Sequence, residues 1–346
     1  MHNPLDSQDY GTTANGGTDA VASQAAYVNP ILDADFPDPA IIRAPDGYYY
    51  AYATQTLRGE QWINIQVARS TDLLNWEPLG DALPEKPDWA TTTQDFWAPS
   101  VIYDGSTYFM YYSATPDACH HHEQGHALAI ATSQSPEGPF VDMGMPLLLG
   151  AGFEYIDPMA FDDPVTGKHF LYWGSGFQPI KIQELGRDRM SFAPDSSAVD
   201  LIWPNRNGEF PRLVEAAWVI HHGDFYYLFY SGDNCCGPDA DYGVMVARSQ
   251  NATGPFETLE QAKGVPHSLI LFKNDRWLAP GHNCIVMDEA GEAWIVYHAI
   301  DVDRPRQRQE DEINSRRVLL MDAVEWHEGW PWIGTPSTEP RSVPVV

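Results

Sequence analysis

Five short runs rich in aromatic residues recur along the chain, and each follows a turn signal such as Asp46-Gly47 or Asp104-Gly105. Aromatic and β-branched side chains fit the pleated, half-buried surface of a sheet, and pairs that contain glycine mark the turns before them. The runs occupy residues 48–53, 108–112, 169–173, 225–230 and 293–297. The pattern therefore predicts a buried strand in each of five repeated units.

A second pattern has the same period of about 60 residues and lies just ahead of each aromatic run. Its members are the motifs Phe36-Pro37-Asp38-Pro39, Phe96-Trp97-Ala98-Pro99, Tyr155-Ile156-Asp157-Pro158, Leu213-Val214-Glu215-Ala216 and Pro280-Gly281-His282-Asn283. Apolar runs at 63–68, 127–131 and 243–247 predict a third strand in most units, which gives each unit about four strands. Radial repetition of four-stranded sheets is the β-propeller architecture, and no stretch has helical periodicity over three turns. We predict an all-β fold, a single five-bladed β-propeller over residues 27–346.

The motifs bring carboxylates from distant parts of the chain to one place. In a propeller the first strand of each blade lines the axis, so Asp38, Asp157 and Glu215 should converge at one mouth of the central channel. The alternative is that the Asp-Pro and Ala-Pro pairs only punctuate turns, but five motifs in register favour convergence. Two carboxyl groups that flank a glycosidic bond can cleave it, one as an acid and the other as a base.

The surroundings of these carboxylates suggest a division of roles. Glu215 precedes an apolar stretch at 216–218, so desolvation would raise its pKa and suit it to act as the acid. A like charge on Asp157 would raise that pKa further. Asp38 lies between two prolines in a rigid turn and would stay ionised as the base. From the residues alone, the acid and base labels could be exchanged.

Aromatic residues interleave with the motifs and are candidates for stacking on sugar rings. These candidates are Phe36, Trp97, Phe153 and Tyr155. Sugars present apolar C–H faces to aromatic rings and leave their hydroxyls for hydrogen bonds. Packing in the wedge between blades is the alternative role for each ring.

Together the five motifs resemble the blade signatures of glycoside hydrolase family 43, and the resemblance covers nearly the whole chain after residue 26. It implies inverting enzymes that act on arabinans, arabinoxylans and xylo-oligosaccharides. By this resemblance Asp38 matches the general base and Glu215 the general acid. Asp157 matches the carboxylate that raises the pKa of the acid and orients the substrate.

Two further positions match the family. Arg316 resembles an arginine that reaches a sugar hydroxyl in some members, and Arg317 is an equal candidate on spacing. His282 matches a histidine that in arabinan-cleaving members lies on the propeller axis near a bound calcium or other ion. A structural calcium held by His282, directly or through water, is therefore expected, with a purely hydrogen-bonding histidine as the alternative. No cofactor is required for the reaction.

The end of the chain favours α-L-arabinofuranosyl linkages in arabinan or arabino-oligosaccharides. The segments 317–326 and 329–331, and the run Cys235-Cys236-Gly237, are similar to arabinan-cleaving relatives. A β-xylosidase or a bifunctional enzyme is the alternative, and a non-catalytic sugar-binding propeller is a distant one. Exo or endo action depends on the loops at 114–126 and 300–314.

The net charge of the chain restricts the classes of molecule that it can bind. The net charge of −28 disfavours nucleic acid and anionic membranes, so we expect a neutral oligo- or polysaccharide of plant type. No apolar segment is long enough to span a membrane. Residues 1–26 form a polar lead that is expected to be extended and lacks the order of a signal peptide. The protein is cytoplasmic if Met1 is native and secreted if a signal was removed. Cys119, His120–His122 and His126 could bind a transition metal, although a loop at the site rim is the alternative.

Overall fold

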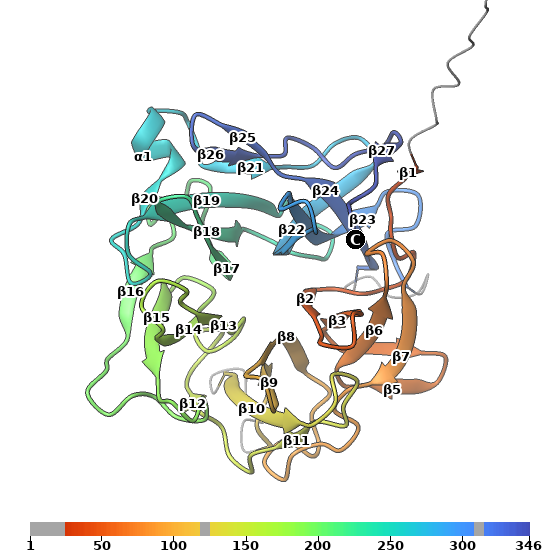
Figure 1. Ribbon diagram of the computed structural model, residues 1–346, viewed down its shortest axis with the longest axis vertical. Helices are drawn as coiled ribbons and strands as arrows, with labels where there is room; N and C mark the ends of the chain where they lie inside the picture. Colours follow the sequence, from red (N-terminus) through yellow and green to blue (C-terminus); the bar gives the residue numbers. More distant parts are fainter. Residues whose placement is uncertain (1–24, 118–124, 308–314) are drawn as a thin grey trace, which may run out of the picture.

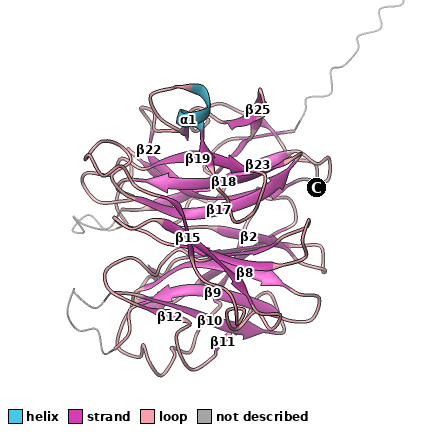
Figure 2. Cartoon of the chain, turned by 90° about the vertical axis from the view of Figure 1, so that its left-hand side faces the viewer, coloured by secondary structure: helices cyan, strands magenta, loops and turns pink. Residues whose placement is uncertain are grey.

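Five antiparallel sheets surround a central axis in the computed structural model, which describes residues 25–117, 125–307 and 315–346 (Figure 1). The first strand of each sheet lies nearest the axis, and the sheets follow one another around it in chain order. In the described residues strands supply nearly all of the regular structure, and the one α-helix, α1 (Leu259–Lys263), lies at the rim (Figure 2). The predicted five-bladed β-propeller is confirmed.

Four of the blades hold at least four strands, and the fifth holds three. Blade one is built from β2 (Ala40–Arg43), β3 (Tyr49–Ala53), β6 (Gln66–Ser70) and β7 (Glu77–Asp81). Blade two is built from β8 (Phe96–Tyr103), β9 (Tyr108–Ala114), β10 (Ala127–Ser133) and β11 (Val141–Asp142), with β12 (Leu148–Leu149) also on β10. Blade three is built from β13 (Met159–Asp162), β14 (His169–Trp173), β15 (Ile180–Leu185) and β16 (Val199–Ile202).

The last two blades follow the same order. Blade four is built from β17 (Val214–His222), β18 (Phe225–Gly232), β19 (Gly243–Ser249) and β20 (Glu257–Thr258), with β21 (Leu269–Leu271) also on β19. Blade five is built from β22 (Trp277–Met287), β23 (Ala293–Asp301) and β24 (Arg317–Ala323). Two hairpins lie outside the blades, β4 (Thr56–Arg58) with β5 (Gln61–Ile63), and β25 (Glu325–His327) with β26 (Trp330–Trp332).

The two ends of the chain close the ring. β1 (Ala26–Tyr27) pairs with β27 (Arg341–Ser342), and the backbone at 31–32 pairs with Leu319 in β24. The side chain of Asn29 reinforces this contact, because it accepts from the backbone N–H of Met321 and donates to its carbonyl. The first residues of the described chain thus complete the outer side of the three-stranded blade. The polar lead predicted for residues 1–26 lies almost wholly outside the described residues, and Ala26 is already part of β1.

The aromatic runs form the second strand of each blade and are buried on both faces. Successive side chains of a strand point to opposite faces of the sheet. In β3, Tyr50 and Tyr52 pack toward blade two, whereas Tyr49 and Ala51 pack toward blade five. A hydrophobic cluster of this kind lies at each of the five blade junctions. Burial on both faces explains why the runs are aromatic without polar interruption.

The predicted third strand of blade one, at 63–68, is shifted in the structure. Ile63 ends the hairpin strand β5, and the blade strand β6 begins at Gln66. The bend between them is fixed by Asp81, whose carboxylate accepts from the backbone N–H groups of Asn64 and Ile65. The predicted third strands at 127–131 and 243–247 lie within β10 and β19.

Candidate active site

Each of the five motifs holds one non-glycine residue in the left-handed backbone region. The φ angles are 57° at Asp38, 46° at Ala98, 57° at Asp157, 58° at Ala216 and 49° at His282. The strand pairing is irregular next to three of them, in β8, β17 and β22. Such a conformation costs an ordinary residue about 1–3 kcal/mol and persists only where the surroundings enforce it. The same local strain at the axial end of every blade aims the five motifs at one centre.

Four of these residues donate their backbone N–H across a blade junction, to a side chain near the end of the second strand of the preceding blade. The pairs are Ala98 to Oγ1 of Thr54 (2.8 Å), Asp157 to Oγ of Ser113 (3.2 Å), His282 to Oγ of Ser231 (2.9 Å) and Asp38 to Nδ1 of His298 (3.1 Å). The junction of blades three and four differs, because the N–H of Ala216 is donated to Oδ2 of Asp157 at 3.0 Å. Neighbouring blades are therefore locked together at the level of the carboxylates.

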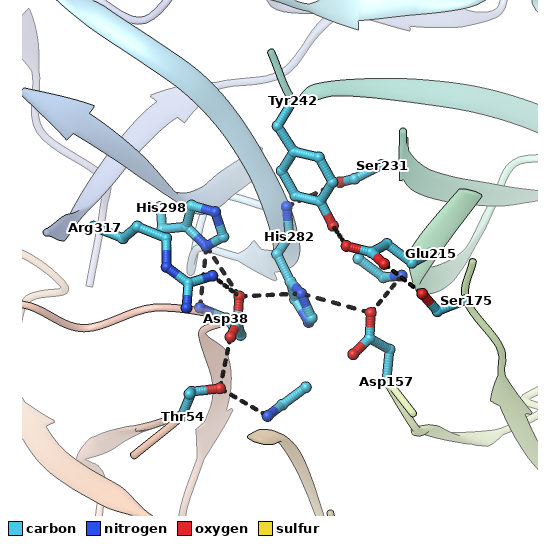
Figure 3. Close-up of polar contacts among 12 residues, drawn as sticks. Asp38, Thr54, Asp157, Ser175, Glu215, Ser231, Tyr242, His282, His298 and Arg317 are labelled. Atoms are coloured by element: carbon cyan, nitrogen blue, oxygen red, sulfur yellow. Dashed lines mark hydrogen bonds and ion pairs between the residues drawn. The ribbon is translucent and has the colours of Figure 1, made fainter. Parts of the chain in front are cut away.

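A cavity of about 670 Å³ opens at this mouth of the axis. All three predicted carboxylates line it, together with Trp97, Phe153, His282 and Arg317. Figure 3 shows Asp38, Asp157 and Glu215 around His282, each from a different blade. The volume is in the range of small-molecule sites, and convergent polar groups in such a cavity mark a candidate active site.

Asp38 lies among groups that stabilise its ionised form. Arg317 donates to Oδ1 at 2.8 Å, and Thr54 donates to Oδ2 at 2.6 Å. Burial alone would raise the pKa of Asp38, but the charge of Arg317, with His282 and His298, lowers it well below its usual range. Burial lowers the pKa of His298 to about 4 and also lowers that of His282, so Arg317 carries the positive charge near neutral pH. Asp38 is therefore a carboxylate, poised to accept a proton.

Glu215 lies among neutral donors. The hydroxyl of Ser175 donates to Oε2 at 2.5 Å and that of Tyr242 donates to Oε1 at 2.6 Å. Burial raises the pKa of Glu215 despite these hydrogen bonds, and the charge of Asp38 adds to the rise. The pKa of Asp157 is raised well above its usual range by burial and by the charges of Glu215 and Asp38. The Glu215–Asp157 pair can thus hold a proton at a pH where Asp38 holds none.

Two of the predicted aromatic contacts line the cavity. Trp97 and Phe153 stack with ring centroids 6.4 Å apart and an interplanar angle of 19°. The ring of His126 lies 4.3 Å from Trp97 and 5.2 Å from Phe153, and its Nδ1 lies 3.2 Å from the carbonyl of Gly152. Because Phe153 is 52% exposed, this wall offers an apolar surface to the cavity.

The other two predicted aromatic contacts do not line the cavity. Phe36 is 1% exposed and packs in the hydrophobic cluster at the junction of blades five and one. Tyr155 packs at the junction of blades two and three, against Gly150, where a Cβ would come within 2.0 Å of the ring. The structure therefore corrects the expectation for both rings, which fill wedges between blades.

The two candidate arginines differ in whether they reach the cavity. Arg317 begins the strand and reaches Asp38 in the cavity. Arg316 instead donates to the backbone carbonyl and to the carboxylate of Asp33, and it does not line the cavity. Arg316 is thus not placed to contact a sugar in this cavity, and Arg317 takes the position that the sequence left open between them.

His282 lies between two of the carboxylates, as expected for a residue on the axis. Its Nδ1 is 3.3 Å from Oδ1 of Asp38 and 3.9 Å from Oδ2 of Asp157. In the part of the chain that the structure describes, no set of three or more His, Cys, Asp or Glu side chains is arranged to hold a metal ion. The calcium expected near His282 stays a prediction. Cys119 and His120–His122 lie outside the described residues, as do parts of the loops 114–126 and 300–314.

Several residues at the site were not anticipated. Thr54, Ser113, Ser231 and His298 each follow directly on an aromatic run, and Ser175 comes two residues after one. This repeated polar position is a signal that the sequence contains and that could have identified them. Tyr242 has no comparable signal, because it lies in the loop just before β19. Cys235 and Cys236 also line the cavity as free, partly buried cysteines.

Comparison with known proteins agrees with this geometry. The family model described as "Glycosyl hydrolases family 43" matches residues 27–331. The "Probable arabinan endo-1,5-alpha-L-arabinosidase A" of Aspergillus flavus is 28% identical over 311 residues, covering 85% of this chain and 89% of the relative. A crystal structure of a thermostable family-43 glycoside hydrolase has a TM-score of 0.74 and 27% identity, covering 92% of this chain and 99% of the other.

A second solved structure is an exo-1,5-α-L-arabinanase from a bovine ruminal metagenomic library. Its TM-score is 0.70 and its identity 25%, covering 87% of this chain and 98% of the other. No described helix is long and apolar enough to cross a membrane. Because the family model spans most of the chain and the family's five motifs converge on one cavity, the protein belongs to glycosyl hydrolases family 43.

Proposed function

We propose that the protein hydrolyses α-1,5-linked arabinofuranosyl bonds of arabinan or arabino-oligosaccharides, with inversion at the anomeric carbon. The observation that carries this proposal is the opposite electrostatic setting of the carboxylates in one cavity. Arg317 lowers the pKa of Asp38, whereas burial raises the pKa of Glu215 and of Asp157. Titratable groups whose surroundings separate their pKa values are the usual mark of a base and an acid.

In the proposed reaction Glu215 protonates the glycosidic oxygen while Asp38 removes a proton from the attacking water. Thr54 and Arg317 hold the Asp38 carboxylate by one hydrogen bond on each oxygen. The charge of Glu215 raises the pKa of Asp157, so the two carboxyl groups compete for a proton, and Oδ2 of Asp157 accepts the N–H of Ala216. A separation of the acid and base by about 6.5–9.5 Å, which leaves room for a water molecule, is expected of an inverting pair.

The substrate proposal draws on the relatives and on charge. One relative is named as an endo-acting arabinan enzyme and one solved neighbour as an exo-acting one, so the linkage is supported more firmly than the cleavage mode. The net charge of −28 and three carboxylates in the cavity favour a neutral glycan over an anionic one. The stacked wall of Trp97 and Phe153 offers a surface for the sugar rings.

Three substrates test the proposal: linear α-1,5-arabinan, a nitrophenyl α-L-arabinofuranoside and a nitrophenyl β-D-xylopyranoside. We expect hydrolysis of arabinan, with an activity on the arabinofuranoside that exceeds the activity on the xylopyranoside. Faster turnover of the xylopyranoside would replace the substrate proposal with the xylosidase alternative. Inactivity on all three would favour a non-catalytic sugar-binding propeller. Proton NMR of the first product decides the stereochemistry, and retention of the α-anomer would overturn inversion.

A further inference from the structure

The two carboxylate oxygens of Glu215 are each held by a buried hydroxyl. Ser175 and Tyr242 are 2% and 1% exposed, and their hydroxyls donate to Oε2 and Oε1 at 2.5 and 2.6 Å. Figure 3 shows the two side chains approaching Glu215 from different sides, Ser175 from the loop after β14 and Tyr242 from the loop before β19. Neither residue belongs to the motifs that carry the carboxylates. Their contacts with the acid are therefore additional to those that the motifs make.

At the junction of blades three and four, the inter-blade hydrogen bond has a different acceptor, and Ser175 donates to Glu215. At the other four junctions the side chain near the end of the second strand accepts the N–H of the left-handed residue in the next blade. At the junction of blades three and four, Asp157 accepts the N–H of Ala216 instead. Gly174 directly follows the aromatic run of blade three and has no side chain to accept an N–H, and the hydroxyl of the next residue, Ser175, donates to Glu215.

The ring of Tyr242 is held in place by His298 and Gly281 of blade five. Its ring stacks on that of His298 with a centroid distance of 5.8 Å and an interplanar angle of 7°. It also fills the space beside Gly281, where a Cβ would come within 2.1 Å of the ring. Nδ1 of His298 accepts the backbone N–H of Asp38. The Tyr242–His298 stack therefore connects the acid to the backbone of the base.

We propose that Ser175 and Tyr242 are positioning residues of the acid. Their two hydroxyls fix the Glu215 side chain and, by donating hydrogen bonds, stabilise the negative charge that forms on it as the proton leaves. The inference rests on the proposed function and extends it to residues outside the motifs. Hydrogen bonds to a carboxylate are stronger than those to a neutral carboxyl group. The pair therefore stabilises the product of proton transfer more than the reactant, which is the condition for accelerating the step.

The test compares Tyr242→Phe and Ser175→Ala with Tyr172→Phe as a matched control. The hydroxyl of Tyr172 donates to the carbonyl of Ala252 in the core between blades three and four, so its loss removes one buried hydrogen bond away from the cavity. Tyr242→Phe keeps the ring and its stacking on His298. We expect it to lower kcat/KM on arabino-oligosaccharides by about tenfold to one-hundredfold, and that on an aryl arabinofuranoside with a good leaving group by less.

The pH profile separates positioning from structural damage. Donors to the carboxylate favour its ionised form, so removing one raises the pKa of Glu215 and moves the alkaline limb of kcat/KM to higher pH. Tyr172→Phe should leave this limb in place. Equal losses on both substrates with an unmoved alkaline limb, in variants whose melting temperature matches that of Tyr172→Phe, would overturn the proposal. Inactivity of the wild type on every arabinofuranosyl substrate would instead overturn the proposed function.

Discussion

Asp38 and Glu215 face one cavity and are both taken out of bulk water, yet their surroundings have opposite effects. At the junction of blades five and one, Arg317 donates to Asp38. The donors to Glu215 are the hydroxyls of Ser175, from blade three, and Tyr242, from blade four. Burial raises the pKa of both groups, and at Asp38 the charge of Arg317, with His282 and His298, reverses this effect. The difference between base and acid thus comes from the partners of Asp38, among which Arg317 contributes most, and not from the degree of burial.

The largest loss of activity is expected when the base is removed. Asp38→Ala should lower kcat about 10³- to 10⁴-fold on arabinan and on activated aryl arabinofuranosides alike, because water activation is needed whatever the leaving group. Initial rates on both substrates measure the effect. A loss confined to arabinan would show that Asp38 is not the base.

At the acid the two substrates should separate. Glu215→Ala should lower kcat on arabinan about 10²- to 10³-fold, and on an aryl glycoside with a good leaving group by about tenfold or less, since that group needs little protonation. A series of aryl arabinofuranosides with leaving groups of increasing pKa makes the measurement. Equal losses along the series would remove the acid role from Glu215.

Substitution of Arg317 by methionine removes the positive charge and leaves both carboxylates in the sequence. Arg317→Met should raise the pKa of Asp38, because burial then acts without an opposing charge. The base must be ionised, so the acidic limb of kcat/KM should move to higher pH, with a loss of about tenfold at neutral pH. Arg317→Lys is the matched variant that keeps the charge, and it should move the limb less. If both variants shift the limb equally, charge is not the cause.

The smallest effect is expected at Asp157. Asp157→Asn removes a like charge beside Glu215 and should lower the pKa of the acid. The alkaline limb of kcat/KM should then move to lower pH, opposite to the shift expected for Tyr242→Phe, with a loss of a few-fold at neutral pH. An alkaline limb that stays in place would mean that the two carboxyl groups are not coupled.

The architecture and the identity of the three carboxylates at the cavity could be predicted from the residue pattern alone. The aromatic runs are long and uninterrupted because the strands of a propeller are buried on both faces, and this pattern is local to each repeat. The motifs recur because every blade needs the same strained turn at the axis. Properties that a single repeat must satisfy are written in each repeat, so the fold and the convergence of Asp38, Asp157 and Glu215 could be predicted.

The contacts between distant residues could not be predicted from the residue pattern. Spacing left Arg316 and Arg317 equivalent, and only the folded chain shows that Arg317 reaches Asp38 while Arg316 bonds to Asp33. Phe36 lies in a motif but packs in a junction, and Tyr242 lies outside every motif but reaches Glu215. The bond from Ala216 to Asp157 breaks the repeat at the blade that carries the acid. These features depend on residues that are far apart in the sequence and are brought together only when the chain folds.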